Sequence, residues 1–391
     1  METIGASKYT QADDRIIAEV QRLFKTEGPI PLHAPTFFGR EKEYLVECID
    51  TTFVSYVGAF VARFDEQVAR FTGAKHAIAM TSGTAALHLG LIVSGVVAND
   101  EVLVPALTFV ATVNPIRYCN AHPIFIDSER ETLGMSPESL ASFLEDHSEL
   151  RDDGYSYNKG TGRRISACIP VHIFGHPCQI EQVKALCEKR NIAVVEDAAE
   201  SLGSLYRGKH TGTFGKVGIL SFNGNKTITT GGGGMLLTDD DAVAARARHL
   251  STTAKRAHKW EFFHDAVGYN YRLPNTSAAI GCAQMESLPI ILQKKRELAA
   301  EYRTFFATLD IPFIDEPRES QSNFWLNGII LSDRAHRDSF LEYSNRAGVM
   351  TRPIWTLMSK LPMFKACQRT SLENAEWLED RVINLPSSAR V

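Results

Sequence analysis

The sequence predicts an α/β protein with a mostly parallel central sheet and a smaller α+β domain toward the C-terminus. In the first two-thirds of the chain, short apolar runs alternate with stretches of helical periodicity. This alternation is typical of a parallel sheet that helices cover on both faces. From about Leu250 onward it gives way to one long helical stretch, short strands and a closing helix. These two patterns together define the expected fold.

Five short runs are expected to form strands of the central sheet, because they are apolar and rich in β-branched residues. They are Ala77–Met80, Glu101–Val104, Pro123–Ile126, Ala167–Val171 and Ile192–Val195. The helical stretches between them are Ala85–Val93, Ser136–Leu144 and Gln179–Lys189. Ligands of such sheets bind beyond the carboxyl ends of the strands, so functional residues are expected just after the apolar runs.

The C-terminal part begins with a long helix over Asn275–Glu301, which Pro289 is expected to kink or interrupt. A strand follows over Trp325–Leu331. We expect three parts of the chain: an N-terminal helical extension over residues 1–28, with an extra helix within Met1–Glu27, a large domain over 29–250 and a small domain over 251–391.

Composition excludes several classes of protein. The net charge of -4 does not indicate the basic surface that nucleic-acid-binding proteins need. The apolar runs are too short to span a bilayer, and the polar N-terminus lacks the apolar core of a signal peptide, so we expect a cytoplasmic protein. The seven cysteines contain no C-x-x-C pair, which predicts free buried thiols and neither a metal site nor a disulfide framework.

The first candidate motif is TSGTAALHL, over Thr81–Leu89, which follows a predicted strand and opens a helix. Gly83 permits a tight turn, and the amides of Thr84 and Ala85 would lie at the helix N-terminus. Unpaired N–H groups and the helix dipole make such an end a phosphate site. The alternative is a plain N-cap made by Ser82 or Thr84.

The second motif is IAVVEDAAES, in which a buried strand ends in two carboxylates, Glu196 and Asp197. Adjacent strand residues point to opposite faces, so only one of the two can face a given ligand. An aspartate at this place would pair with a protonated pyridinium nitrogen and make that ring an electron sink. A helix N-cap or a surface turn is the alternative.

The third motif is ILSFNGNKTITTGGGGMLLTDD, where an apolar run ends in Ser221 and Lys226 follows in a short polar stretch. A lysine at a strand end can form a Schiff base with an aldehyde cofactor. A solvated surface lysine and a hairpin turn are the alternatives. The glycines Gly231–Gly234 lack the G-x-G-x-x-G spacing and precede a strand-like run, and no P-loop motif is present, so a dinucleotide or P-loop site is excluded.

Taken in order, seven motifs resemble the DegT/DnrJ/StrS family of sugar aminotransferases, which are fold-type I enzymes that depend on pyridoxal phosphate (PLP). The motifs are TSGTAALHL, DEVLVPALTFVATVNPI, PIFIDSERETLGMSP, VHIFGHPCQ, VVEDAAESLGS, GTFGKVGILSFNGNKTITTGGGGM and GYNYRLPN. The resemblance covers roughly Pro29 to Val391.

Four segments are most similar to the LegC-like branch of that family: PLHAPTF, CIDTTFVSYVGAFV, NGNKTITTGGGGM and RPIWTLMSKLPMF. Most of the wider family has an acid in a T-G-E-G-G motif, whereas Gly232 stands at that place here, as in the LegC-like branch.

The resemblance implies a role for each matching residue. Lys226 would hold PLP covalently, and Asp197 would pair with its ring nitrogen. The remaining cofactor residues would be Phe109 on the ring face, Gly83, Thr84 and Ser221 at the phosphate, Glu200 near the phenolic oxygen and Asn270 at the phosphate of the partner subunit. His172 and Arg352 are candidate substrate residues, with a structural histidine and a surface arginine as the alternatives.

The same resemblance implies a homodimer with shared active sites and a reaction that alternates between PLP and pyridoxamine phosphate. L-glutamate would give the amino group and leave as 2-oxoglutarate. The acceptor would be a UDP-linked, N-acetylated 4-keto sugar of the 6-deoxy type, whose diphosphate Arg352 or His33 would bind. Its product would enter a surface glycan such as the O-antigen of lipopolysaccharide.

Three alternatives remain at this point. An aminotransferase of the same family would act on a dTDP- or GDP-linked keto sugar. A PLP-dependent sugar dehydratase would have the same scaffold, but such relatives carry histidine in place of the lysine, which Lys226 argues against. A scaffold protein without activity would be expected to lack Lys226 or Asp197, and both are present.

Overall fold

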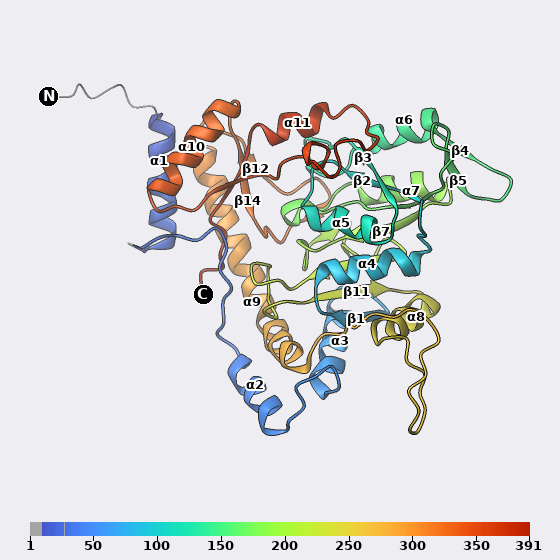
Figure 1. Cartoon of the computed structure of the whole chain (residues 1–391). Helices are drawn as coiled ribbons and strands as arrows, with labels where there is room; N and C mark the ends of the chain where they lie inside the picture. Colours follow the sequence, from blue (N-terminus) through green and yellow to red (C-terminus); the bar gives the residue numbers. More distant parts are fainter. Residues whose placement is uncertain (1–9, 27) are drawn as a thin grey trace.

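The computed structural model describes residues 10–26 and 28–391 of the chain. It has a large domain around one sheet and a small domain around a second sheet, with the long helix α9 running between them (Figure 1). The predicted helix within Met1–Glu27 is present as α1, Gln11–Phe24, while residues 1–9 and 27 of that prediction lie outside the described residues. The other helices are α2 (Glu41–Asp50), α3 (Ala59–Thr72), α4 (Gly83–Ser94), α5 (Val110–Tyr118), α6 (Pro137–His147), α7 (Ile180–Glu188), α8 (Asp241–Ser251), α9 (Asn275–Phe306), α10 (Arg334–Arg346) and α11 (Glu373–Glu379).

The central sheet has seven strands in the order β1-β11-β10-β7-β6-β2-β3. They are β1 (His76–Met80), β2 (Glu101–Pro105), β3 (His122–Ile126), β6 (Ile165–Cys168), β7 (Ala193–Asp197), β10 (Val217–Ser221) and β11 (Gly234–Thr238). Only β11 runs antiparallel to its neighbours, and the pairs from β10 to β3 are parallel. The predicted mostly parallel sheet is therefore confirmed. Each of the five predicted strands overlaps a strand of the sheet, although β6 begins two residues before the predicted run Ala167–Val171.

Side chains alternate between the two faces of this sheet, and helices pack against both faces. In β2, Val102 and Val104 face the cluster that contains α4, α5 and α8, whereas Leu103 faces the cluster that contains α6 and α7. A parallel sheet covered on both faces leaves the carboxyl ends of its strands as the open edge. The functional motifs that follow β1, β7 and β10 therefore meet at one edge.

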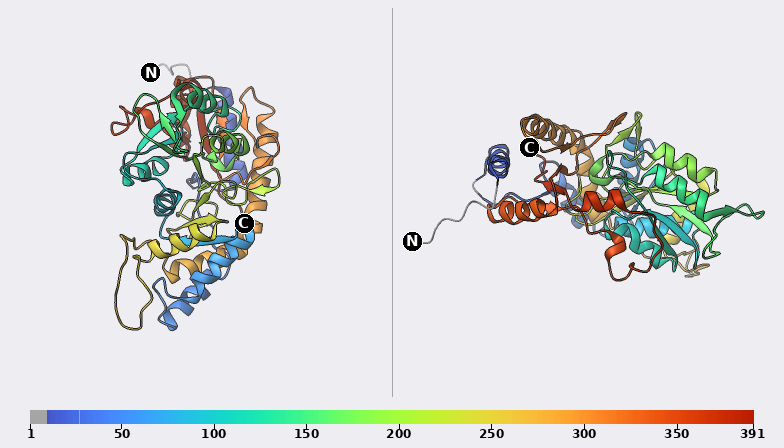
Figure 2. Two further views of the ribbon diagram at one scale, coloured as in Figure 1. Left: turned by 90° about the vertical axis from the view of Figure 1, so that its right-hand side faces the viewer. Right: turned by 90° about the horizontal axis from the view of Figure 1, so that it is seen from above.

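The small domain has a four-stranded sheet in the order β12-β14-β16-β15, formed by Phe313–Ile314, Asn327–Ile330, Val382–Leu385 and Arg352–Pro353. The N-terminal helix α1 packs on it, because Ile16 and Val20 share a core with Phe340 of α10. His336 of α10 also contacts the Asp13 carboxylate at 3.0 Å. Figure 2 shows α1 beside α10 from a second direction.

The helix α9 belongs to both domains. Its first half packs with α3, through Ala279 and Leu288, and its last turns pack with the small sheet, through Tyr302. Pro289 does not interrupt it, since the helix continues to Phe306 and burial on both sides of the proline supports it. We therefore propose that the domain division lies within α9 and not between residues 250 and 251.

Within residues 10–26 and 28–391, no helix has both the length and the apolar character needed to cross a membrane.

Candidate active site

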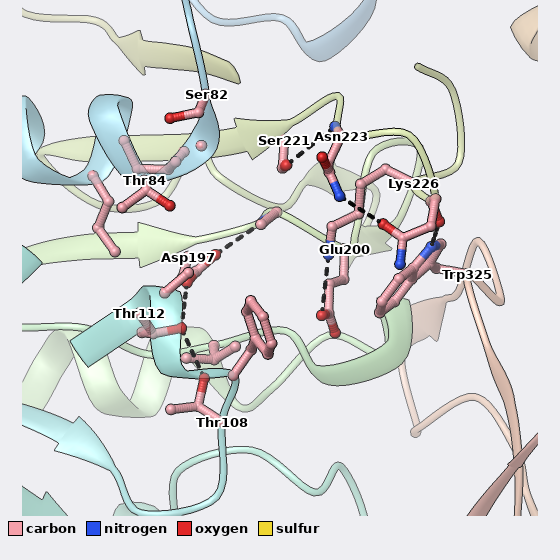
Figure 3. Close-up of a pocket in the computed structure, with 18 of the residues that line it drawn as sticks. Ser82, Thr84, Thr108, Thr112, Asp197, Glu200, Ser221, Asn223, Lys226 and Trp325 are labelled. Carbon is pink, nitrogen blue, oxygen red and sulfur yellow. Dashed lines mark hydrogen bonds and ion pairs between the residues drawn. The ribbon is translucent and has the colours of Figure 1, made fainter. Parts of the chain in front are cut away.

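A cavity of about 340 Å³ opens at the carboxyl ends of β7 and β10 (Figure 3). It lies between the N-terminus of α4, the start of α5 and the loop that follows β10. The sequence-predicted residues that line it are Gly83, Thr84, Phe109, Asp197, Glu200, Ser221 and Lys226. Residues more than a hundred positions apart in the sequence thus meet at one place, as the edge of a parallel sheet requires.

The two adjacent carboxylates at the end of β7 point in opposite directions. Asp197 lines the cavity, whereas Glu196 is fully buried behind the sheet. There Glu196 accepts hydrogen bonds from the amides of Gly212 at 2.8 Å and Gly215 at 2.6 Å, and His172 Nε2 lies 3.1 Å from it. Strand alternation therefore makes Glu196 a structural anchor and leaves Asp197 for the ligand.

The Asp197 carboxylate is held in place by α5 and by its own loop. Thr112 Oγ1 donates to Asp197 Oδ2 at 2.8 Å, and Thr108 Oγ1 lies 2.8 Å from the Thr112 hydroxyl. The amide of Ala199 donates to Asp197 Oδ1 at 3.1 Å. These contacts fix a negative charge at the cavity wall, where it would pair with a protonated ring nitrogen.

Lys226 extends into the opposite side of the cavity (Figure 3). Its Nζ donates to Glu200 Oε1 at 3.2 Å and lies 3.9 Å from the centroid of the Trp325 ring. The second oxygen of Glu200 accepts from the Phe174 amide at 2.8 Å. Burial raises the pKa of the Glu200 carboxyl, while the amine of Lys226 partly offsets that rise. The amine is therefore largely enclosed and faces an aromatic ring and a carboxyl.

The N-terminus of α4 forms the third wall. Ser82 caps this helix, its hydroxyl accepting from the Ala85 amide at 3.0 Å. An α-helix leaves its first amides without helical acceptors, so Gly83 and Thr84 present N–H groups to the cavity. Ser221, at the end of β10, adds a hydroxyl beside them. This arrangement suits a phosphate group.

Gly234 lets β11 pass directly behind this helix terminus. A Cβ on Gly234 would lie 2.4 Å from the backbone carbon of Ser82 and 2.5 Å from the Gly83 nitrogen. A Cβ on Gly83 itself would lie 3.0 Å from the Ser221 Cβ. Gly83 and Gly234 are therefore required because the backbone segments approach each other closely. Gly234 belongs to the run Gly231–Gly234 and lies against the proposed phosphate site.

We expect Gly234→Ala to destabilise the protein by about 2 kcal/mol, because the backbone of Ser82 must move to admit the methyl group. Gly232→Ala is the matched control, since a Cβ there meets nothing within 4 Å. Urea unfolding of the two variants measures the difference. Equal midpoints for Gly234→Ala and Gly232→Ala would show that the close approach has no energetic consequence.

Phe109 covers the cavity from the start of α5 and is half exposed. Its ring centroid lies 6.3 Å from that of Trp355, which comes from the small domain and also lines the cavity. A flat ring placed between Asp197 and Lys226 would be covered by such an aromatic face. The predicted stacking position of Phe109 is thus compatible with its placement.

Four predicted residues do not line this cavity, and one of them, His33, contacts the Lys295 amine instead. His172 is fully buried and uses both ring nitrogens, on Glu196 and on the Cys178 amide at 3.2 Å. Arg352 lies in β15, where its guanidinium donates to Asn345 Oδ1 at 2.9 Å. We therefore leave His172 and Arg352 out of the proposed site. Asn270 forms a β-bridge with Thr252 and is exposed to solvent outside the cavity.

Several residues of the cavity wall were not predicted from the sequence. Thr112 lies in the first turn of α5, and Thr108 lies just before that helix, so the four-residue spacing of the two threonines was a usable signal. Trp325 and Trp355 come from the small domain and reach the site only through long-range packing. No local pattern around these two tryptophans marks them as site residues.

The described residues fit pyridoxal phosphate. An enclosed amine on Lys226 would bind its aldehyde carbon, and Asp197 would bind its ring nitrogen. The N-terminus of α4 would bind its phosphate. Gly234 lies so close to this helix end that a side chain at position 234 would not fit. The three walls carry the amine, the anion and the N–H donors that this cofactor requires.

Comparisons with known proteins agree with this geometry. The family model described as the DegT/DnrJ/EryC1/StrS aminotransferase family matches residues 37–391. The chain is 36% identical over 360 residues to the GDP-perosamine synthase of Escherichia coli O157:H7, covering 92% of this chain and 93% of that protein. It is 38% identical over 367 residues to EpsN of Bacillus subtilis (strain 168), which is named as a pyridoxal phosphate-dependent aminotransferase, with 93% and 92% covered.

A solved structure has the same fold. The aminotransferase TlmJ from Streptoalloteichus hindustanus superposes with a TM-score of 0.83 at 27% sequence identity. The match covers 92% of this chain and 94% of that chain. The correspondence therefore extends through both domains.

Proposed function

The chain belongs to the DegT/DnrJ/EryC1/StrS aminotransferase family, and on this premise we propose that it aminates a UDP-linked, N-acetylated 4-keto sugar with L-glutamate as the donor. The coarser function needs no proposal, since the chain is a PLP-dependent sugar aminotransferase of fold type I. The single observation that carries the site assignment is the cavity that joins Lys226, Asp197 and the N-terminus of α4.

In the proposed reaction, bound PLP supplies a protonated ring that withdraws electrons from the carbon undergoing amination. Asp197 holds the proton on the ring nitrogen, while Thr112 keeps the Asp197 carboxylate in orientation. Lys226 Nζ moves the proton at the carbon that loses or gains the amino group, acting first as base and then as acid. The same residues serve both half-reactions, so ping-pong kinetics are expected.

The choice of a UDP-linked N-acetyl sugar rests on the LegC-like motifs. One of them, RPIWTLMSKLPMF, contains Trp355, which lines the cavity. A second candidate is a GDP-linked keto sugar without an acetamido group, which is favoured by the 36% identity to a protein named GDP-perosamine synthase. The two candidates differ in the nucleotide and in the acetamido group. Action in the cytoplasm and entry of the product into a surface glycan are further parts of the proposal.

A substrate panel tests the proposal. The pyridoxamine phosphate form would be offered UDP-4-keto-6-deoxy-N-acetylglucosamine, a dTDP-3-keto sugar and a GDP-4-keto sugar, and the products analysed by mass spectrometry. We expect kcat/KM for the UDP sugar to be higher by about 100-fold, because a site that hydrogen-bonds the acetamido oxygen rejects analogues that lack it. Preference for the GDP sugar would instead support the second candidate.

We also propose a homodimer in which each chain completes the site of the other. Lys226 is the one lysine or arginine that lines the cavity within the described residues, although a phosphate and a sugar diphosphate must both be bound. The segment 252–270, here called the aromatic hairpin, projects from the body (Figures 1 and 2) and exposes Trp260 and Phe262 by 73% and 79%. Apolar side chains exposed to this extent favour burial against another chain. Asn270 lies at the base of the hairpin.

Mixing inactive variants tests the dimer. In a mixed dimer of Lys226→Ala and Asn270→Asp chains, one site would carry both changes and the other would carry neither. Random exchange should therefore restore about a quarter of wild-type activity. If confirmed exchange restored no activity, each site would have to be formed by one chain alone.

A further inference from the structure

Lys295 is a lysine buried in the middle of α9, with 1% of its surface exposed. Its Nζ donates hydrogen bonds to the Trp325 carbonyl at 3.1 Å and the Ser387 carbonyl at 2.7 Å, and lies 3.0 Å from His33 Nε2. These partners come from the segment before α2, the segment before β14 and the segment after β16. One amine thus joins three chain segments that are distant in the sequence.

The hydrogen bonds of this junction compensate for a costly burial. Burial lowers the pKa of the Lys295 amine to about 7. Burial and the positive charges of Lys295 and Lys226 also lower the pKa of His33 well below its ordinary value, so His33 is neutral and its Nε2 accepts from Lys295. All three acceptors are then uncharged, and hydrogen bonds of good length hold the amine.

Trp325 links these contacts around Lys295 to Lys226. The Trp325 amide donates to Asn323 Oδ1 at 2.8 Å, and its indole Nε1 donates to the Asn225 carbonyl at 2.7 Å. Its carbonyl is held by Lys295, and its ring covers the Lys226 amine at 3.9 Å. Figure 3 shows the indole beside Lys226 at the cavity. Three hydrogen bonds therefore hold Trp325 in place, and Lys295 of α9 donates one of them.

We propose that Lys295 is a positioning residue that holds Trp325 against the amine of Lys226, and thereby keeps this amine aimed at the cofactor. The inference rests on the proposed role of Lys226. Lys295 does not line the cavity, and the residue that it contacts next to Lys226 is Trp325. An amine that packs under an indole has few orientations available, and loss of that orientation slows covalent reaction even where the fold survives.

The test follows the covalent binding of PLP to the cofactor-free protein by stopped-flow absorbance in the visible range. Lys295→Met should lower the second-order rate constant by about ten-fold, because the Trp325 carbonyl loses its donor. Lys294→Met is the matched control: Lys294 directly precedes Lys295 in the same helix, is partly exposed and pairs with Glu297 at 2.9 Å. This control should keep the wild-type rate.

A double-mutant cycle asks whether Lys295 acts through the tryptophan. Trp325→Phe should also slow binding, and Lys295→Met should add little to it, because residues on one chain of contacts are not additive. Fully additive effects, or a wild-type rate in Lys295→Met, would contradict the proposal. If Lys295→Met fails to fold, Lys295→Gln replaces it with an expected loss of about three-fold, since its shorter amide cannot reach all three acceptors; a wild-type rate would contradict the proposal there too.

The proposed function is judged separately. In the wild-type protein, borohydride reduction followed by peptide mapping places the bound cofactor on a lysine. Attachment to Lys226 together with a wild-type rate in the Lys295 variants would overturn only the inference about Lys295. Attachment elsewhere would overturn the role of Lys226 itself.

Discussion

Replacing Lys226 by alanine is expected to lower the rate of transamination by at least about 10⁴-fold, because the group that binds the cofactor and moves the proton is removed. Among residues 10–26 and 28–391, its amine contacts Glu200 and the Trp325 ring at the edge of the cavity. The free energy of unfolding should therefore change little. Single-turnover rates with L-glutamate measure the loss, and urea unfolding measures stability.

Lys216→Ala is the matched control for this substitution. Lys216 is exposed and directly precedes β10, whereas Lys226 follows the carboxyl end of the same strand. One strand thus carries a lysine near each end, and only the lysine at the carboxyl end lies in the cavity. Lys216→Ala should retain wild-type rates. Near-normal turnover in Lys226→Ala would refute the assignment.

The second large effect is expected from Asp197→Asn, which keeps the shape of the side chain but removes its charge. A neutral amide no longer favours a proton on the ring nitrogen, so the rate should fall by about 10³-fold. Thr112 can still hydrogen-bond the amide at this position, and stability should be nearly unchanged. The visible spectrum and single-turnover rates of the PLP-bound variant measure this.

Glu196→Gln, one residue earlier, should show the reverse pattern. Glu196 accepts from the amides of Gly212, Phe214 and Gly215 in the interior, so loss of its charge should destabilise the fold by about 3 kcal/mol. Its effect on the chemical step in the folded protein should be small. If the two variants had the same effects on rate and stability, the division of roles across β7 would be wrong.

Much of the candidate site could be predicted because it lies at strand ends. Lys226, Asp197 and Gly83 each follow an apolar run or open a helix, and the order of strand and helix places those ends at one edge. The alternation rule also required that only one of Glu196 and Asp197 face the ligand. The alternation rule alone left the choice open, and the family resemblance assigned the role to Asp197. The structure places Asp197 in the cavity, while the loop at Gly212 holds Glu196 in the interior.

The remaining parts depend on packing between distant segments. Trp325 and Lys295 belong to the small domain and to α9, and their roles come from contacts with residues far away in the sequence. His172 was a candidate for the substrate because of the family resemblance, yet its ring faces Glu196 behind the sheet. A residue type at a strand end does not reveal which side of the sheet its ring will occupy.

The most direct test of the account is to locate the bound cofactor. The purified protein loaded with PLP would be reduced with borohydride, digested and analysed by mass spectrometry for the peptide that carries the added pyridoxyl phosphate. The account predicts the label on Lys226 alone, in the segment between β10 and β11. A label on Lys295, Lys216 or any other lysine, with Lys226 unmodified, would contradict it.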